Sequence, residues 1–97
     1  MKRVIFRPEA RLDALEAYRW YEARDAGRGQ KFRDEVDRVL GLAAERPMAY
    51  PILLRDARRA LLKRFPYAIV FRTYDDTVVV VAVMHSRRGR RMLKQRL

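Results

Sequence analysis

The feature that most constrains the fold of this 97-residue chain is an uninterrupted apolar run, Val78–Met84. Five of its seven residues are valines, and β-branched residues favour strands. The run lacks the polar–apolar alternation of a strand with one wet face, so we expect a central strand that is covered on both faces. It is far shorter than the roughly 20 apolar residues that cross a bilayer, so we expect no membrane span.

Further strand patterns surround this run. Three segments of the second half are rich in Val, Ile, Phe and Tyr: 57–64, 67–74 and 77–85. Asp75 and Asp76 supply a short turn between the last two, and the three segments together predict an antiparallel meander. Residues 3–7 form another short strand pattern, which Pro8 stops, and we expect this strand as an extra neighbour of the central one.

Two helices are predicted between the first strand and the meander. The first has a stripe of mostly small residues with the spacing i, i+4, i+7, i+8 and i+11: Ala10, Ala14, Ala17, Tyr18 and Tyr21. The second repeats that spacing: Phe32, Val36, Val39, Leu40 and Ala43. A glycine-containing turn at 25–29 joins the helices, and Pro47 ends the second one, so the pattern predicts an antiparallel helical hairpin that packs on the sheet.

The length allows one domain and one core but not two, so we expect a single domain over residues 1–97. The predicted fold class is α+β: an N-terminal strand, an antiparallel helical hairpin and a three-stranded antiparallel meander, with the helices packed on one face of the sheet. The cations near the N-terminus are followed by no long apolar stretch or small-residue cleavage site, which favours a cytoplasmic location.

The residues that hold cofactors and metals are scarce in this sequence. The chain has no cysteine, which excludes disulfides, thiolate catalysis and thiolate zinc sites. His85 is the only histidine. We therefore expect neither a metal nor a cofactor.

The charges are segregated along the chain. Residues 8–47 hold eight Lys/Arg and nine Asp/Glu, a net charge of −1, whereas residues 48–97 hold twelve Lys/Arg and three Asp/Glu, a net charge of +9. A neutral half beside a strongly basic half favours an anionic partner, either nucleic acid or an acidic protein. The alternative is that the basic composition reflects only an Arg-rich genome.

The C-terminal segment 87–97 is a basic tail with six cations and no acid. A short helix is expected at its end, where Met92, Leu93 and Leu97 are the only large apolar residues, and the segment is judged too polar to be core. Because its cations repel one another unless an anion binds, a binding role is favoured over a frayed, solvated tail.

Four short sequence motifs are spread along the chain: Trp20-Tyr21-Glu22, Pro47 with Tyr50-Pro51, Phe65-Pro66-Tyr67, and His85-Ser86-Arg87-Arg88. With the order strand, helical hairpin and meander, they resemble the RelE/ParE toxins of type II toxin–antitoxin systems along nearly the whole chain. Two positions depart from that pattern. Arg90 and Leu93 occupy places where such sequences often have proline and tryptophan, and this departure bears on what the tail binds.

The resemblance implies one of two activities, cleavage of messenger RNA on the ribosome or poisoning of DNA gyrase. RNA cleavage needs a base, an acid and cations around the phosphate. Histidine is the side-chain type suited to acid–base work near neutral pH, and His85 with Lys63, Arg64 and Arg88 forms the candidate catalytic set of a metal-independent endoribonuclease. RNA-cleaving relatives often carry a tyrosine near the C-terminus. No aromatic residue follows Tyr74 here, so the pattern lies nearer the ParE side and favours gyrase.

Arginines of the basic half are the candidates for binding the target: Arg58, Arg59, Arg64, Arg72, Arg87, Arg88, Arg90 and Arg91. Structural roles are open alternatives for other residues. His85 is equally suited to an end-of-strand role in which its ring bonds to the backbone. For Tyr18, Trp20 and Tyr21, packing in the core or hairpin is favoured over stacking on bases.

The resemblance also implies a protein partner, a cognate antitoxin whose acidic or amphipathic segment wraps the toxin in a hetero-oligomer. Two harmless alternatives stay open. One is a nucleic-acid-binding module with steep salt dependence. The other is a decayed toxin that keeps only antitoxin binding, which the departures at Arg90 and Leu93 suggest.

Overall fold

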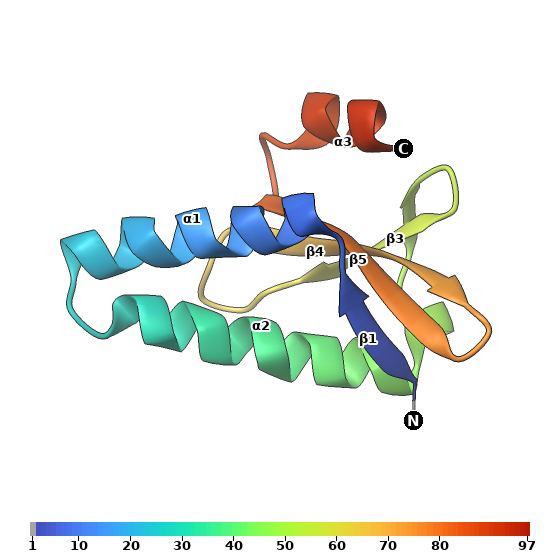
Figure 1. Ribbon diagram of the computed structural model, residues 1–97, viewed down its shortest axis with the longest axis horizontal. Helices are drawn as coiled ribbons and strands as arrows, with labels where there is room; N and C mark the ends of the chain where they lie inside the picture. Colours follow the sequence, from blue (N-terminus) through green and yellow to red (C-terminus); the bar gives the residue numbers. More distant parts are fainter. Residues whose placement is uncertain (1) are drawn as a thin grey trace.

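The two helices of the predicted hairpin form where their apolar stripes place them. In the computed structural model, which describes residues 2–97, α1 (Pro8–Arg24) and α2 (Arg28–Glu45) run antiparallel and pack together (Figure 1). Gly27 joins them with a left-handed φ of 90°, which glycine adopts without strain. The Glu22 carboxylate accepts a hydrogen bond of 2.9 Å from the Gly27 N–H and so ties the turn back to α1.

A five-stranded mixed sheet forms the second layer, in the order β1-β5-β4-β3-β2. Its strands are β1 (Arg3–Phe6), β2 (Ile52–Leu54), β3 (Ala57–Leu61), β4 (Tyr67–Tyr74) and β5 (Thr77–His85). β3, β4 and β5 make the predicted antiparallel meander, and β1 lies parallel to β5 as its expected neighbour. β2 was not predicted; it is a short edge strand after a 3₁₀ turn at Pro47–Ala49. β3 also ends at Leu61 rather than at residue 64.

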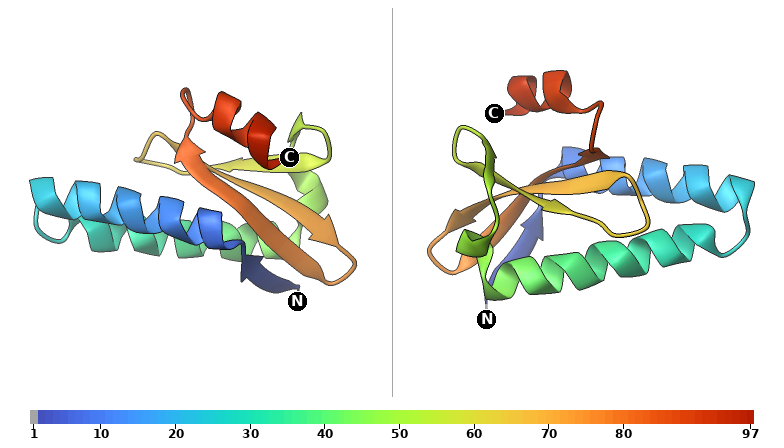
Figure 2. Two further views of the ribbon diagram at one scale, coloured as in Figure 1. Left: turned by 45° about the horizontal axis from the view of Figure 1, so that its top comes forward. Right: turned by 180° about the vertical axis from the view of Figure 1, so that it is seen from behind.

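Both faces of the sheet are covered over the apolar run in β5, as its lack of alternation predicts. α1 and α2 cover one face, and the larger core between them and the sheet includes Phe32, Val36, Ile69, Phe71 and Val80. α3 (Arg90–Arg96) covers the other face, over a smaller cluster of Ala57, Val70, Val81, Ala82, Met84 and Leu93. Figure 2 shows the sheet between the hairpin and α3. No helix within residues 2–97 is long and apolar enough to cross a membrane.

A β-bulge in β5 places two consecutive residues of the strand in the smaller cluster. The register between β4 and β5 passes from the pair Phe71–Val80 to the pair Val70–Ala82, so Val81 is an extra residue in β5. Val81 and Ala82 both pack under α3, whereas strict alternation would send them to opposite faces.

The C-terminal segment contributes to the core, so the prediction that it is too polar is wrong. The short helix expected there is present as α3, and Leu93 on it is fully buried. Inward positions repeat with helical spacing: Gly89, Met92, Leu93, Arg96 and Leu97. The stripe was missed because a glycine and an arginine occupy two of its five positions.

An ion pair anchors α3 to α1 and to the edge of β5. The Asp13 carboxylate oxygens lie 2.6 and 3.0 Å from the two Arg96 Nη atoms, and the side chains are only 13% and 15% exposed. Arg96 also donates to the Val81 carbonyl, and Asp13 accepts from the Val83 N–H, both at 3.1 Å. β1 pairs with β5 only as far as Val80. The two side chains therefore supply hydrogen bonds to β5 just beyond the reach of β1.

Candidate functional site

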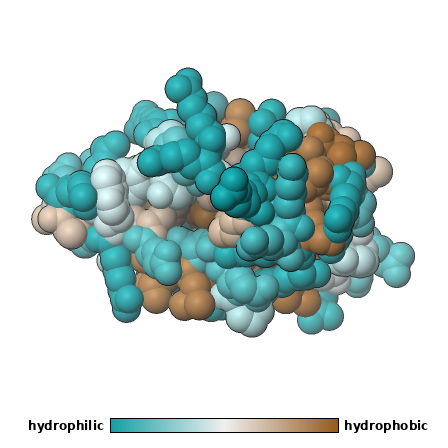
Figure 3. Space-filling model, turned by 90° about the horizontal axis from the view of Figure 1, so that it is seen from above, coloured by the Kyte–Doolittle hydropathy of each residue, from teal (hydrophilic) through white to brown (hydrophobic). Residues whose placement is uncertain are grey.

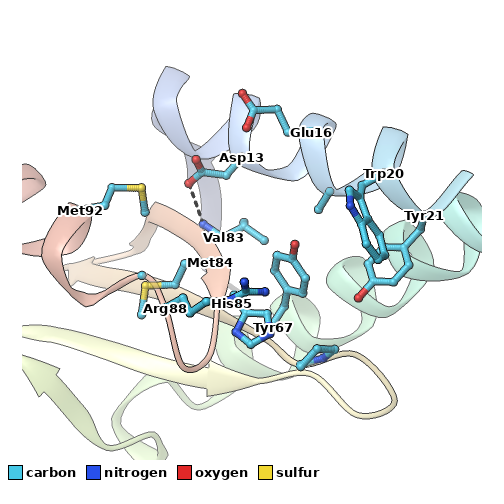
Figure 4. A pocket seen from close by; sticks show the side chains of 13 residues that line it. Asp13, Glu16, Trp20, Tyr21, Tyr67, Val83, Met84, His85, Arg88 and Met92 are labelled. Carbon is cyan, nitrogen blue, oxygen red and sulfur yellow. Dashed lines mark hydrogen bonds between the residues drawn. The ribbon is translucent and has the colours of Figure 1, made fainter. Parts of the chain in front are cut away.

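A cavity of about 570 Å³ lies where the end of β5 meets α1 and the turn before α3 (Figure 4). His85, Tyr67 and Arg88 line it from the side of the sheet, and Glu16 and Trp20 line it from α1. Figure 4 shows the Tyr67 side chain pointing toward α1, with the His85 ring beside it. The cavity combines aromatic walls with two carboxylates, those of Asp13 and Glu16, one guanidinium and one imidazole, which suits recognition of a polar group or acid–base work.

His85 has the backbone contact expected of an end-of-strand residue. Its Nδ1 accepts a hydrogen bond of 3.2 Å from the Arg87 N–H. In the neutral ring, the proton therefore lies on Nε2. The ring stands edge-on to Tyr67, with 5.7 Å between the ring centres. These contacts give His85 a structural role and leave only Nε2 for chemistry.

Two tyrosines beside the cavity hold their protons firmly. Burial raises the pKa of Tyr67, and the nearby Arg88 opposes part of that rise. Burial also raises the pKa of Tyr21. Both hydroxyls are therefore hydrogen-bond donors at neutral pH. Trp20 was expected to pack in the core or hairpin. It lies outside the core, since it is 50% exposed, but its ring packs edge-on against Tyr21, with 5.0 Å between the ring centres, and the Arg24 guanidinium lies 3.6 Å from its ring centre.

A second cavity, of about 580 Å³, lies between α2 and the loop that joins β3 to β4. Its lining contains five cations: Arg28, Lys31, Arg38, Lys63 and Arg64. The candidate catalytic set is thus divided between two cavities, because Lys63 and Arg64 line this one whereas His85 and Arg88 line the other. Tyr21 packs between them, in contact with the rings of both Phe65 and Tyr67.

Glu35 ties the loop of the second cavity to α2. Its carboxylate accepts two hydrogen bonds from Arg38, at 2.8 and 2.9 Å, and one from the Lys63 N–H at 2.7 Å. The bond from Arg38 is the main reason that the pKa of Glu35 falls from 4.5 to about 2. Arg64 follows in the left-handed region, at φ 65°, where a residue with a side chain is strained. The loop is therefore held in one defined conformation.

The candidate arginines on β3 and β4 do not form one surface. Arg58 lies on the face of the sheet that the hairpin covers, and it donates to the Tyr50 carbonyl at 2.7 Å. Arg59 and Arg72 lie on the α3 face. Arg72 is already paired with Asp56 at 2.7 Å, which leaves Arg59 as the available cation of the three.

The remaining candidates gather on and just before α3. They are exposed and make no ion pair with any residue in the described part of the chain: Arg87, Arg88, Arg90 and Arg91, joined by Lys94. Figure 3 looks onto this side of the molecule, and hydrophilic side chains cover most of the middle of the view. No group of three or more His, Asp or Glu residues within 2–97 is arranged to hold a metal ion.

Comparisons with known proteins place these features in a family. A family model described as the ParE toxin of the type II toxin–antitoxin system parDE matches residues 4–90. A solved structure described as the chromosomal ParDE toxin–antitoxin system from P. aeruginosa matches with a TM-score of 0.77 and 15% sequence identity, over 88% of this chain and 96% of the other. That structural likeness confirms the predicted α+β fold. No curated protein sequence matches this chain.

Proposed function

Because the chain belongs to the ParE toxin family of type II toxin–antitoxin systems, we propose that it arrests growth by acting on DNA gyrase and that a cognate antitoxin neutralises it. The family match over residues 4–90 carries this proposal, since it spans the helical hairpin and almost the entire sheet. Gyrase and chromosomal DNA are cytoplasmic in bacteria, so a cytoplasmic location is part of the same proposal.

The placement of the candidate catalytic residues supports gyrase over RNA cleavage. A nuclease needs its base, acid and phosphate-binding cations around one scissile bond. Here Lys63 and Arg64 line a different cavity from His85 and Arg88, and the Nδ1 of His85 is occupied by a backbone N–H. A surface that binds a large target does not need such convergence.

A second candidate function, metal-independent cleavage of messenger RNA, is favoured by one specific observation. His85, Tyr67 and Arg88 line the same cavity, which brings together an imidazole, a phenol and a guanidinium. Such a set can exchange protons with a ribose hydroxyl and stabilise charge on a phosphate. These three residues, rather than the divided set predicted from sequence, are the ones to test for nuclease activity.

We propose that the antitoxin binds where α1 and α2 meet the free edge of β1. A groove of about 360 Å³ there has an apolar lining that includes Phe6, Leu15 and Val36, and Arg11 and Arg33 also line it. β1 is an edge strand, so its outer hydrogen-bonding groups are available for pairing. An acidic, amphipathic segment fits this surface, because its apolar side chains would enter the groove while its acids meet the two arginines.

Induced expression of the chain, alone and with its antitoxin, tests the proposed function. Growth arrest with intact messages and lost plasmid supercoiling is expected, and the antitoxin should restore growth. Cut messages with normal supercoiling would support the nuclease instead. In that case, a variant with both His85→Ala and Arg88→Ala should no longer arrest growth.

Unimpaired growth at a confirmed protein level would exclude both toxic activities. It would leave a nucleic-acid-binding module or a decayed toxin. Antitoxin binding separates these two, since only the decayed toxin keeps it. Replacement of the exposed Leu15 at the groove with aspartate should abolish that binding, whereas the same replacement of the exposed Leu61 on β3 should not.

A further inference from the structure

The outer surface of α3 consists of cations and one amide. The inward positions hold Met92, Leu93, Arg96 and Leu97, whereas the outward positions hold the exposed Arg90, Arg91, Lys94 and Gln95. Arg87 is exposed in the turn just before the helix. We call Arg87, Arg90, Arg91 and Lys94 the α3 cation face. None of these four forms an ion pair with another residue in the range 2–97.

The α3 cation face is held in place by contacts on the other side of the helix. Leu93 is fully buried, and Arg96 is paired with Asp13 on α1. Gly89 sits so close to Met84 that a Cβ atom there would lie 2.6 Å from the Met84 Cβ. The face is therefore presented by a docked helix and not by a frayed tail.

The docked helix keeps like charges close together. Arg90 and Lys94 are four residues apart on α3, and like charges at this spacing repel on a helix. No acidic residue follows Asp76 to balance them. Arg59, which lies on the same face of the sheet, adds a further cation nearby. Binding of an external anion reduces the repulsion between these cations.

We propose that the α3 cation face binds the phosphate backbone of duplex DNA. Proteins that bind single strands stack bases on aromatic side chains, and no aromatic residue follows Tyr74. Protein interfaces need an apolar or aromatic centre, which the outward positions of α3 lack. A row of cations on a rigid helix, with nothing to stack on and nothing apolar to bury, matches a regular line of phosphates.

This inference goes beyond the proposed action on gyrase and does not depend on it. The matched family region ends at residue 90, whereas α3 spans Arg90–Arg96, so two of the four cations, Arg91 and Lys94, lie outside that region. DNA binding through α3 would hold the toxin on the polymer that gyrase acts on. It would also be measurable in the complete absence of gyrase.

The salt dependence of binding gives the expected size of the effect. Four phosphate contacts predict a slope of about −3.6 for log K against log salt on duplex DNA, or a loss of about 150-fold in affinity between 50 and 200 mM salt. Removal of three of the four cations should reduce the slope to about −0.9.

The test measures binding of the purified chain to a fluorescent 20-base-pair DNA duplex by anisotropy across that salt range. The variant replaces Arg90, Arg91 and Lys94 with glutamine. A matched control makes the same replacement at Arg19, Arg33 and Arg46, three exposed cations outside α3, and so removes the same charge. Both triple variants change exposed side chains only, and equal thermal midpoints establish that they fold.

The proposal expects the α3 variant to lose most of its affinity and slope while the control keeps nearly all of both. Equal losses in the two variants would overturn it, because net charge alone would then explain binding. So would tighter binding to a single strand of the same length, or equal binding of poly-glutamate at equal charge. Growth arrest by the α3 variant is scored separately, so loss of DNA binding is distinguishable from loss of toxicity.

Discussion

Asp13 and Arg96 are 83 positions apart in the chain, and together they close a gap in the hydrogen bonding of β5. Each side chain bonds both to its partner and to the strand, at Val83 and Val81 respectively. No local pattern predicts such a pair, because its geometry exists only after α1, β5 and α3 have packed. The Asp13 bond also raises the pKa of Arg96, so the guanidinium is charged at neutral pH.

Replacement of Asp13 with asparagine should destabilise the protein by about 2 kcal/mol, since it leaves the largely buried Arg96 charge without its partner. Urea unfolding measures the loss. Asp56→Asn at the exposed pair with Arg72 is the matched control, and its midpoint should stay close to that of the wild type. Equal midpoints for the two variants would show that the Asp13 pair does not anchor α3.

Glu35 gives a prediction about pH. Its pKa in the folded protein is about 2, below the ordinary 4.5, so it adds stability that is fully present above pH 4.5 and is lost as the pH falls toward 2. Glu35→Gln should therefore be less stable than the wild type at neutral pH, and the difference should shrink across that window. Unfolding free energies at several pH values test this, and a constant difference would contradict it.

At the scale of secondary-structure elements, periodicity predicted the hairpin and the meander because each has its own repeating pattern. α3 shows where that method fails. Its inward stripe includes Gly89 and Arg96, which reach the core through close approach and an ion pair rather than through apolar bulk. The apolar run in β5 nevertheless predicted that both faces of the sheet are covered. The hairpin covers one face, and the C-terminal segment 87–97 was the remaining part of the sequence that could cover the other.

Gly89 tests whether α3 must dock closely. Gly89→Ala would place a Cβ atom 2.6 Å from the Met84 Cβ, on a strand that cannot move away, so α3 should be displaced. Faster amide hydrogen exchange in residues 89–97 is the expected result. Gly41→Ala in α2 has no atom within 4 Å of its new Cβ and should stabilise the protein by about 0.5–1 kcal/mol. Unchanged exchange in the Gly89 variant would contradict the close packing.

At the scale of the whole molecule, the charge segregation seen in the sequence becomes a division between layers. The nearly neutral part, residues 8–47, forms the helical hairpin, and the basic part forms most of the sheet and α3. The candidate arginines divide among several surfaces, because neighbouring residues on a strand point to opposite faces. Arg58 and Arg59 show this directly. Spacing along the sequence could not predict which arginine would donate to a backbone carbonyl, as Arg58 does, and which would be available to a partner.

We propose that this ParE-family chain acts on DNA gyrase, and a supercoiling assay with purified components tests this action most directly. Relaxed plasmid, ATP and gyrase are incubated with increasing amounts of the chain, with and without the antitoxin. The expected result is a dose-dependent loss of supercoiling that the antitoxin reverses. Full supercoiling at a large molar excess of the purified chain, when expression of the same chain arrests growth in cells, would contradict action on gyrase. The cavity lined by His85, Tyr67 and Arg88 would then be the site to test.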